Sequence, residues 1–284
     1  MKRKAAETGS WRFPLASDPG SSAQEARWDF LGNADPGGEQ NAAWGHAVSS
    51  YVSSLPLLST SAVTARALNE IETKALLAAA GVAVTATELA RTAQEAAAVA
   101  ERLACPVALK IVSPDIVHKS DVDGVRLGLA SPAAAAAAFD EILHAVRARQ
   151  PEARLDGVSV QPMAPPGGVE VIVGVSVDAQ FGHVIMCGLG GVLVEVLHDV
   201  VFRLIPLQPR DARQMLTELR GLPLLRGVRG RPGVSLHAVE ELLLRLSDLV
   251  ARRPQIRELD LNPVLAYPDG VLAVDARALI EAEQ

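Results

Sequence analysis

The sequence predicts an α+β fold whose sheets are largely antiparallel. Two observations support this prediction. Amphipathic helical stretches alternate with short runs rich in Val, Ile and Leu, and turn sequences such as residues 178–182 join successive runs as hairpins. A hairpin pairs its two strands antiparallel, so these turns favour α+β over a doubly wound parallel sheet. The expected strands are residues 107–112, 125–129, 158–163, 169–177, 184–187 and 192–197.

Four helices are expected around these strands. The first covers residues 64–80, where apolar side chains recur at helical spacing and Gly81 follows the last of them. Thr92 opens the second helix with a capping-box pattern, and Ser131 precedes a proline at the start of the third. Ser235 precedes the fourth helix, which carries another apolar stripe.

Composition bounds the size and class of the protein. The chain has 284 residues and 49% hydrophobic content, which suffices for about two lobes with a buried core. Its formal charge of −6 means that acidic residues outnumber basic ones, so no nucleic-acid partner is expected. Cys105 and Cys187 lie in apolar runs without CxxC spacing, as expected in a reducing compartment. Since no run of about 18 apolar residues and no signal-peptide pattern occurs, we expect a soluble cytoplasmic protein without membrane contact.

The first 60 residues differ from the rest of the chain. Gly, Ser, Pro, Asn and Gln are dense there, and Trp11, Trp28 and Trp44 follow no period. A segment of this composition can bury little apolar surface, so residues 1–60 are expected to form an irregular or flexible N-terminal extension. The folded domain is expected to cover residues 61–284.

The segment from Glu258 to Asp275 can build a divalent-metal site from one β-hairpin. Glu258, Asp260 and Asn262 alternate with leucines, so a strand places them on one polar face. If the turn at residues 267–270 is centred between its two middle residues, antiparallel pairing sets Asn262 opposite Asp275. Two carboxylates and an amide oxygen then converge, and Mg2+ prefers such oxygen ligands. The other interpretation is a solvated edge hairpin with ordinary surface acids.

Lys110 and the loop that follows it can contact phosphates. The strand 107–112 has Val107, Leu109 and Ile111 on its apolar face, which turns Lys110 to the other side. Residues 113–124 are polar, contain glycine and could fold over phosphates as a mobile lid. A solvated lysine and a surface His118 are the simpler interpretations of the same residues.

Two further loops admit a nucleotide. Residues 161–170 join two apolar strands through a stiff, proline-rich linker that could line an adenine slot or serve as a plain interstrand loop. Residues 188–191 read Gly-Leu-Gly-Gly and allow close backbone approach, although they lack the GxGxxG spacing and the chain contains no Walker A motif.

The order and spacing of these motifs resemble a known family. From about Thr64 to Ile280 the chain is similar to the ATP-grasp domain of the NDP-forming acyl-CoA synthetases, the ADP-forming acetate–CoA ligase family, and more distantly to the succinyl-CoA synthetase β subunit. The matching residues are Glu72, Lys74, 106–110, 118–121, 124–125, 170–174, Asp178, 181–182, 188–191, Glu195, Asp199, 202–203, Pro206, 258–263 and Asp275.

The resemblance implies an ATP-grasp fold, in which two lobes sandwich a nucleotide. The smaller lobe would cover about residues 82–157, and the larger about 158–284 with the helix 64–80. The implied site residues are His118 for phosphoryl transfer, Lys110 for the ATP phosphates, Gln161 and the backbone near Met163 for adenine, Glu170 for the ribose side, and Asp260, Asn262 and Asp275 for Mg2+.

The resemblance also implies the activity. The chain would be the ATP-binding subunit of an ADP-forming acyl-CoA synthetase, with ATP/ADP and Mg2+ as cofactors. Its partner would be a separate CoA-binding α-type subunit that carries a phosphohistidine, since the chain has no CoA-binding domain of its own.

One residue departs from the family pattern. The family loop usually reads His-Lys-Ser/Thr-Asp-x-Gly-Gly-Val, and Asp123 replaces the first of those glycines. A carboxylate there would repel phosphates, and the position could require a positive φ. This departure and the missing CoA-binding and ligase domains make a nucleotide-binding regulatory module without turnover the alternative function.

Overall fold

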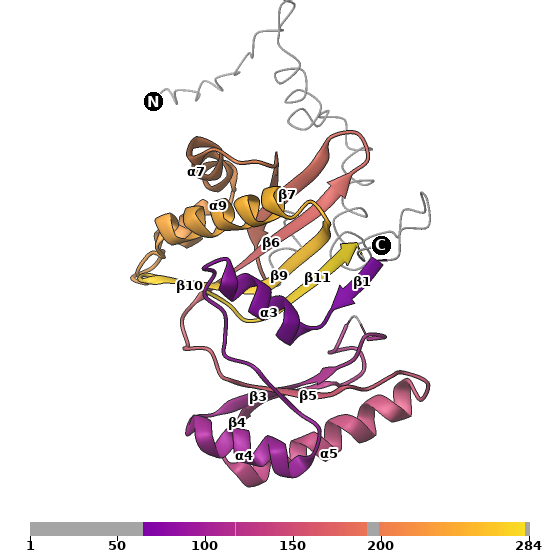
Figure 1. The fold of residues 1–284 in the computed structure, drawn as a ribbon. Helices are drawn as coiled ribbons and strands as arrows, with labels where there is room; N and C mark the ends of the chain where they lie inside the picture. Colours follow the sequence, from indigo (N-terminus) through magenta and orange to yellow (C-terminus); the bar gives the residue numbers. More distant parts are fainter. Residues whose placement is uncertain (1–64, 117, 192–198, 282–284) are drawn as a thin grey trace, which may run out of the picture. The chain divides into compact units, whose positions relative to one another are not determined.

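The computed structural model describes residues 65–281, apart from residue 117 and residues 192–198 (Figure 1). The expected N-terminal extension and the expected strand 192–197 lie outside the described residues. Within the described part, the chain forms two antiparallel sheets with helices packed against them, as the sequence predicts. No helix of this part is both long enough and apolar enough to cross a lipid bilayer.

The smaller sheet has four strands in the order β2-β5-β3-β4, and all its pairs are antiparallel. Its strands are β2 (Glu88–Ala90), β3 (Val107–Val112), β4 (Val125–Leu129) and β5 (Gly157–Pro162). Helices α4 (Ala93–Leu103) and α5 (Pro132–Arg149) cover one face of it, as Figure 1 shows. Both begin where the sequence predicts, because Thr92 and Ser131 cap them with their side chains.

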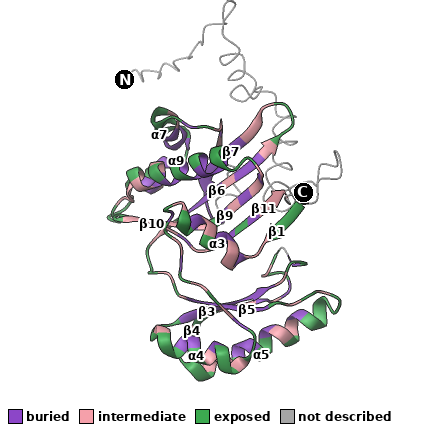
Figure 2. Ribbon diagram, in the orientation of Figure 1, coloured by how far each residue is buried: buried purple, intermediate pink, exposed green. Residues whose placement is uncertain are grey.

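The two faces of the smaller sheet carry different side chains. Apolar side chains face the helices, and polar side chains lie on the other face. Val107, Leu109 and Ile111 of β3 are fully buried in the core that α4 and α5 also line. Strand alternation therefore places Lys110 of β3 and Gln161 of β5 on the opposite face of the sheet. Figure 2 shows β3 and β5 buried, while the outer sides of α4 and α5 are exposed.

The larger sheet has seven strands, in the order β1-β11-β9-β6-β7-β8 with β10 paired to β9. Its strands are β1 (Ala65–Leu68), β6 (Val169–Asp178), β7 (Gly182–Leu189), β8 (Val200–Leu204), β9 (Ile256–Tyr267), β10 (Gly270–Ala273) and β11 (Ala276–Glu281). The helices of this unit are α3 (Glu70–Ala79), α7 (Pro209–Glu218), α8 (Leu222–Arg226) and α9 (Leu236–Arg252). Helix α9 packs its apolar stripe, including Leu243 and Leu246, into the core of this sheet.

Two predicted boundaries are wrong. The helix expected over residues 64–80 is a strand, β1, followed by the shorter helix α3, because Ala65–Leu68 pair with β11 and Asn69 caps the helix in a capping box with Glu72. Strand β5 was expected in the larger lobe, but it pairs with β2 and β3. The chain therefore leaves the smaller sheet after Pro162 and not at residue 158.

The predicted register of the hairpin that contains Glu258 to Asp275 is confirmed. We call this segment the metal hairpin, after the metal site predicted for it. Strand β10 pairs with β9 from Gly270 opposite Tyr267 to Ala273 opposite Val264. Strand β11 resumes the pairing in the same register with Ala276 opposite Leu261. Asn262 and Asp275 are therefore opposite each other at the break between β10 and β11, as the turn position requires.

Candidate functional site

A cluster of buried and half-buried charged side chains joins four separate segments of the chain. Its members are Glu70 of α3, Lys110 of β3, Lys119 of the following loop and Asp275 before β11. Lys110 Nζ lies 3.1 Å from Glu70 Oε1 and 3.0 Å from Asp275 Oδ2. Lys119 Nζ lies 3.0 Å from Glu70 Oε2 and 2.9 Å from Asp275 Oδ2. Two lysines thus bridge the same two carboxylates.

A third lysine, Lys74, approaches the same carboxylate from within α3. Its Nζ lies 2.8 Å from Glu70 Oε1 and donates to Thr85 Oγ1 at 2.7 Å and Gln161 Oε1 at 2.7 Å. Burial lowers the pKa of Lys74 to about 8, and the charge of Glu70 opposes that shift. Lys74 therefore stays largely protonated at neutral pH.

The lysines hold Glu70 in its charged form. Burial raises the pKa of Glu70, but the charges of Lys110, Lys119 and Lys74 outweigh burial and lower the pKa to about 2. When Lys74 is counted with the four members of the cluster, three ammonium groups face the carboxylates of Glu70 and Asp275, so these five side chains carry a net positive charge. Such a cluster can accept an anionic ligand such as a phosphate chain.

The metal hairpin contributes two acids that repel each other. Burial raises the pKa of Asp260 to about 6, the charge of Asp275 adds to that shift, and Arg277 and His118 act against it. Asn262 is exposed and opposite Asp275. A divalent cation between Asp260 and Asp275 would remove their repulsion, so the residues present fit Mg2+ with water and phosphate oxygens completing its ligands. The described residues contain no group of three His, Cys, Asp or Glu side chains that could hold a metal without such help.

The structure brings the predicted phosphate lysine and a predicted metal ligand into contact. The sequence places Lys110 and Asp275 far apart, yet their side chains are 3.0 Å apart. A metal bound to a nucleotide lies beside its phosphates, so this contact is the geometry expected of a site for a metal–phosphate complex.

His118 lies in the loop between β3 and β4, directly before Lys119. Its side chain is exposed, while Lys119 is drawn into the cluster. His118 is close enough to Asp260 for its charge to lower the pKa of that acid. The catalytic role and the neighbourhood of His118 stay predictions, and the residue itself is exposed.

The loop that carries His118 is fixed at several points. Asp115 pairs with Arg154 at 2.7 Å, and the side chains of Ile116 and Val122 are buried in the core of the smaller unit. A Cβ on Gly124 would lie 2.5 Å from Ile111 Cγ2, so this position admits only glycine without movement. The mobile lid predicted from the sequence is thus a loop with buried anchors on both sides of His118.

Asp123 has the positive φ that its position was expected to require, at 57°. Its carboxylate does not stand alone, because Arg126 Nη1 donates to Asp123 Oδ1 at 2.8 Å. The expected repulsion between this carboxylate and a phosphate is therefore reduced by a neighbouring guanidinium. Hydrogen bonding to Arg126 lowers the pKa of Asp123, which keeps the carboxylate charged.

The residues predicted to contact adenine differ in accessibility. Gln161 is only 1% exposed, and its amide is engaged with Lys74 and with the Val274 carbonyl oxygen. Met163 is 39% exposed, and its N–H donates to the Pro106 carbonyl oxygen. The exposed Leu127 lies on strand β4, on the other side of β3 from β5. Apolar surface near Met163 is thus available to a flat base, whereas a contact from Gln161 stays a prediction.

The glycine-rich strand end meets Glu170. The Gly190 N–H donates to the Glu170 carbonyl oxygen at 2.7 Å, and a Cβ on Gly190 would lie 2.8 Å from Glu170 Cβ. The glycines of residues 188–191 were expected to allow a close backbone approach, and the backbone that Gly190 approaches is that of strand β6. The Glu170 side chain is exposed at the start of that strand, and its contact with a ribose stays a prediction.

Sequence reasoning did not assign Glu70, Lys74 and Lys119 to the site. Glu70 and Lys74 are spaced i,i+4 on one helix, which is the ordinary pattern of a surface ion pair. Both are buried here, and only the fold reveals it. Lys119 follows His118 in a loop, where its sequence carries no sign of burial.

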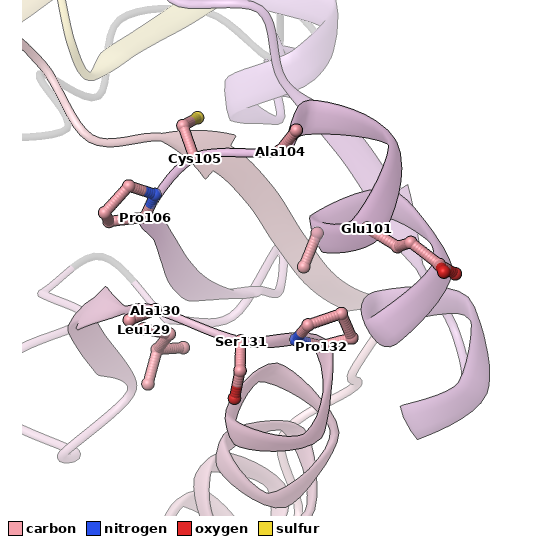
Figure 3. Close-up of a pocket in the computed structure, with 9 residues that line it drawn as sticks. Glu101, Ala104, Cys105, Pro106, Leu129, Ala130, Ser131 and Pro132 are labelled. Atoms are coloured by element: carbon pink, nitrogen blue, oxygen red, sulfur yellow. The ribbon is translucent and has the colours of Figure 1, made fainter.

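A separate pocket of about 400 Å3 lies at the end of α4 and the start of α5 (Figure 3). It is lined by Glu101, Cys105, Pro106, Leu129 and Ser131 among others, and contains none of the charged cluster. Cys105 is exposed beside this pocket, whereas Cys187 is buried.

Comparison with known proteins identifies the family of this chain. A family model described as an ATP-grasp domain matches residues 60–280. The chain therefore belongs to the ATP-grasp family, which confirms the fold expected from the resemblance. Among its relatives, the β subunit of ADP-forming acetate–CoA ligase II from Pyrococcus furiosus is 44% identical over 218 residues, covering 76% of this chain and 92% of that one.

Solved structures of similar chains bind nucleotide analogues. A Ca. Korarchaeum cryptofilum dinucleotide forming acetyl-coenzyme A synthetase 1, in complex with coenzyme A, Ca-AMPCP and HgCl+, matches with a TM-score of 0.74 at 42% identity, over 76% of this chain and 94% of that one. Another structure of that enzyme holds coenzyme A and Mg-AMPPCP, with a phosphohistidine segment pointing towards the nucleotide binding site. It matches with a TM-score of 0.66 at 40% identity, over 76% and 93% of the two chains.

Proposed function

We propose that this chain is the ATP-binding subunit of an ADP-forming acyl-CoA synthetase that works with a separate CoA-binding partner. The reaction is acid + CoA + ATP ⇌ acyl-CoA + ADP + phosphate. Family membership supports the reaction class. The observation that carries the proposal for this chain is the meeting of Lys110, Asp275 and the His118 loop in one cluster.

The lysines account for phosphate binding. Lys110 and Lys119 present two ammonium groups at one place, and both are held there by Glu70 and Asp275. Preorganised cations stabilise the charge on a phosphoryl group in transfer, since they need no reorientation when that charge develops. Asp260, Asn262 and Asp275 would hold Mg2+, which neutralises phosphate charge and orients the chain of phosphates when bound.

His118 accounts for the transfer. An unprotonated ring nitrogen of His118 supplies an electron pair to the γ-phosphorus of ATP, so that an N–P bond forms while the bond to the bridging oxygen breaks. ADP leaves with that oxygen. The phosphoryl group then passes from His118 to the histidine of the partner subunit, and the reverse order returns it to ADP. The exposed ring of His118 is a condition for this exchange, because the partner must reach it.

Labelling with ATP that carries radioactive γ-phosphate tests the proposal. Wild-type protein with Mg2+ should acquire an acid-labile label that is absent from His118→Ala. His237→Ala is the matched control, since His237 is also exposed but lies on α9, and it should label as wild type does. Label that persists in His118→Ala would refute the role of this histidine.

The regulatory alternative predicts a different result. A module without turnover would bind ATP in calorimetry but take no label from ATP or from a phosphorylated CoA-binding partner. The Asp123 charge, one of the two features that motivated this alternative, is paired with Arg126.

A further inference from the structure

The turn that ends the His118 loop is closed by backbone hydrogen bonds. The Gly124 N–H donates to the Lys119 carbonyl oxygen at 2.8 Å, and the Asp123 N–H donates to the Ser120 carbonyl oxygen at 3.1 Å. Asp123 is the left-handed residue of this turn, with φ of 57°. Whatever stabilises this conformation also fixes the backbone of Lys119, and so the position of the neighbouring His118.

Side-chain contacts reinforce the turn from strand β4. Arg126 forms a two-point pair with Asp123, with Nη1 to Oδ1 at 2.8 Å and Nη2 to Oδ2 at 3.2 Å. The same Nη1 donates to the Asp123 carbonyl oxygen at 3.1 Å. One guanidinium therefore holds both the side chain and the backbone of the left-handed residue. Two-point pairs of this kind fix geometry as well as contributing energy.

Helix α5 supports the pair from both sides. Arg126 Nε donates to Glu141 Oε2 at 3.2 Å, which orients the guanidinium. Arg149 Nη1 lies 3.8 Å from Asp123 Oδ2 and donates to the Val122 carbonyl oxygen at 3.5 Å. The turn is thus connected to a rigid helix through two arginines, whereas an isolated surface ion pair would have no such support.

We propose that Asp123 and Arg126 form a latch that positions His118 for phosphoryl transfer. In the family pattern a glycine occupies position 123, which supplies a positive φ but leaves the turn flexible. Aspartate is one of the residues that best tolerate a positive φ, and Asp123 adopts it here. The hydrogen bonds from Arg126 stabilise Asp123 in this conformation. Both are positioning residues, acting through the turn. The latch rests on the proposed function, because it orients the histidine to which that function assigns the transfer.

The latch can be opened without forcing the backbone. Asp123→Asn keeps a residue that tolerates a positive φ but removes the charge, and Arg126→Gln removes the guanidinium. In each variant the amides of residues 123 and 124 should exchange with deuterium faster than in wild type. Labelling of His118 by ATP should slow about fivefold, while the dissociation constant of the nucleotide changes less than about twofold. The double variant should be no slower than either single variant, since both remove one pair.

Arg102→Gln is the matched control. It breaks the exposed Arg102–Glu88 ion pair on the same unit, away from the His118 loop, and should leave exchange in the loop and labelling unchanged. Arg126→Gln that exchanges and labels as wild type does would overturn the latch, as would equal slowing in Arg102→Gln or multiplicative slowing in the double variant. If wild type takes no label, the proposed function fails, and exchange alone decides whether the latch exists.

Discussion

The metal hairpin and the His118 loop reach the same cluster by different means. The hairpin of β9, β10 and β11 is organised by its own sequence, since alternation and one turn set Asn262 opposite Asp275. The loop is organised by partners elsewhere in the chain. Lys119 contacts Glu70, which lies 49 positions away, and Asp115 contacts Arg154, which lies 39 positions away.

The difference shows which kind of site a sequence can reveal. A strand has a period of two, so residue spacing alone states which side chains converge. A loop has no period, and its conformation follows from the buried groups and ion pairs that hold it. The hairpin should therefore tolerate changes in its turn, whereas the loop should be sensitive to changes in distant residues.

Removal of the Glu70 charge should give the largest effect. Glu70→Gln leaves Lys74, Lys110 and Lys119 facing only Asp275, and breaking a buried ion pair in this way costs about 3–5 kcal/mol. The free energy of unfolding in urea measures it. Glu88→Gln is the control, because Glu88 is an exposed acid with one arginine partner, and it should cost less than about 1 kcal/mol.

The same residue gives a pH dependence with a defined sign. The pKa of Glu70 is about 2 in the folded protein against an ordinary value of 4.5, so the unfolded chain binds more protons between these values. Its contribution to stability is complete above pH 4.5 and is lost as the pH falls towards about 2. Glu70→Gln should therefore lose less stability than wild type between pH 5 and about pH 3. Parallel curves for the two proteins would show that Glu70 is not held charged by the lysines.

Much of the fold was predictable because its signals are local. Helices α4, α5 and α9 begin after Thr92, Ser131 and Ser235, whose side chains cap them as their sequence positions indicate. Strand β1 was not predictable from helical spacing, because its state depends on pairing with β11 at the other end of the described chain.

The candidate site divides in the same way. Lys110 and Asp275 were predicted from strand periodicity and from the resemblance, and His118 from the resemblance. The burial of Glu70 and Lys74 was not, since it depends on contacts such as that between Glu70 and Lys110, 40 positions apart. The hydrogen bond from Lys74 to Gln161 depends on the same packing, so it could not be predicted from the sequence.

Lys110→Ala should weaken nucleotide binding more than it weakens the fold. The variant loses a charge-assisted contact to phosphate worth about 1.5–3 kcal/mol, so ATP affinity should fall roughly 10- to 150-fold. Stability should change less, because two lysines then face two carboxylates and the charges balance. If calorimetry shows that Lys110→Ala binds ATP with nearly wild-type affinity, Lys110 does not contact the phosphates.

Two glycine substitutions compare the loop with the hairpin directly. In Gly124→Ala the new Cβ would lie 2.5 Å from Ile111 Cγ2 and 2.9 Å from the Lys119 carbonyl oxygen, so the variant should lose about 1–3 kcal/mol of stability. Gly270→Ala in the hairpin turn meets nothing within 4 Å and should change stability by less than about 0.5 kcal/mol. Equal losses in urea unfolding would contradict the difference drawn between the two regions.

The most direct test of the account is whether the hairpin binds nucleotide through Mg2+. Asp260→Asn keeps the shape of the side chain and removes the charge that a hard cation requires. Glu258→Gln is the matched control, since Glu258 lies on the same strand and face as Asp260, one step further from Asn262. Calorimetry with ATP should show that Asp260→Asn weakens binding about tenfold with Mg2+ and hardly at all without it, while Glu258→Gln binds as wild type does. Equal weakening of Asp260→Asn with and without Mg2+ would contradict the metal site and leave Asp260 a structural role.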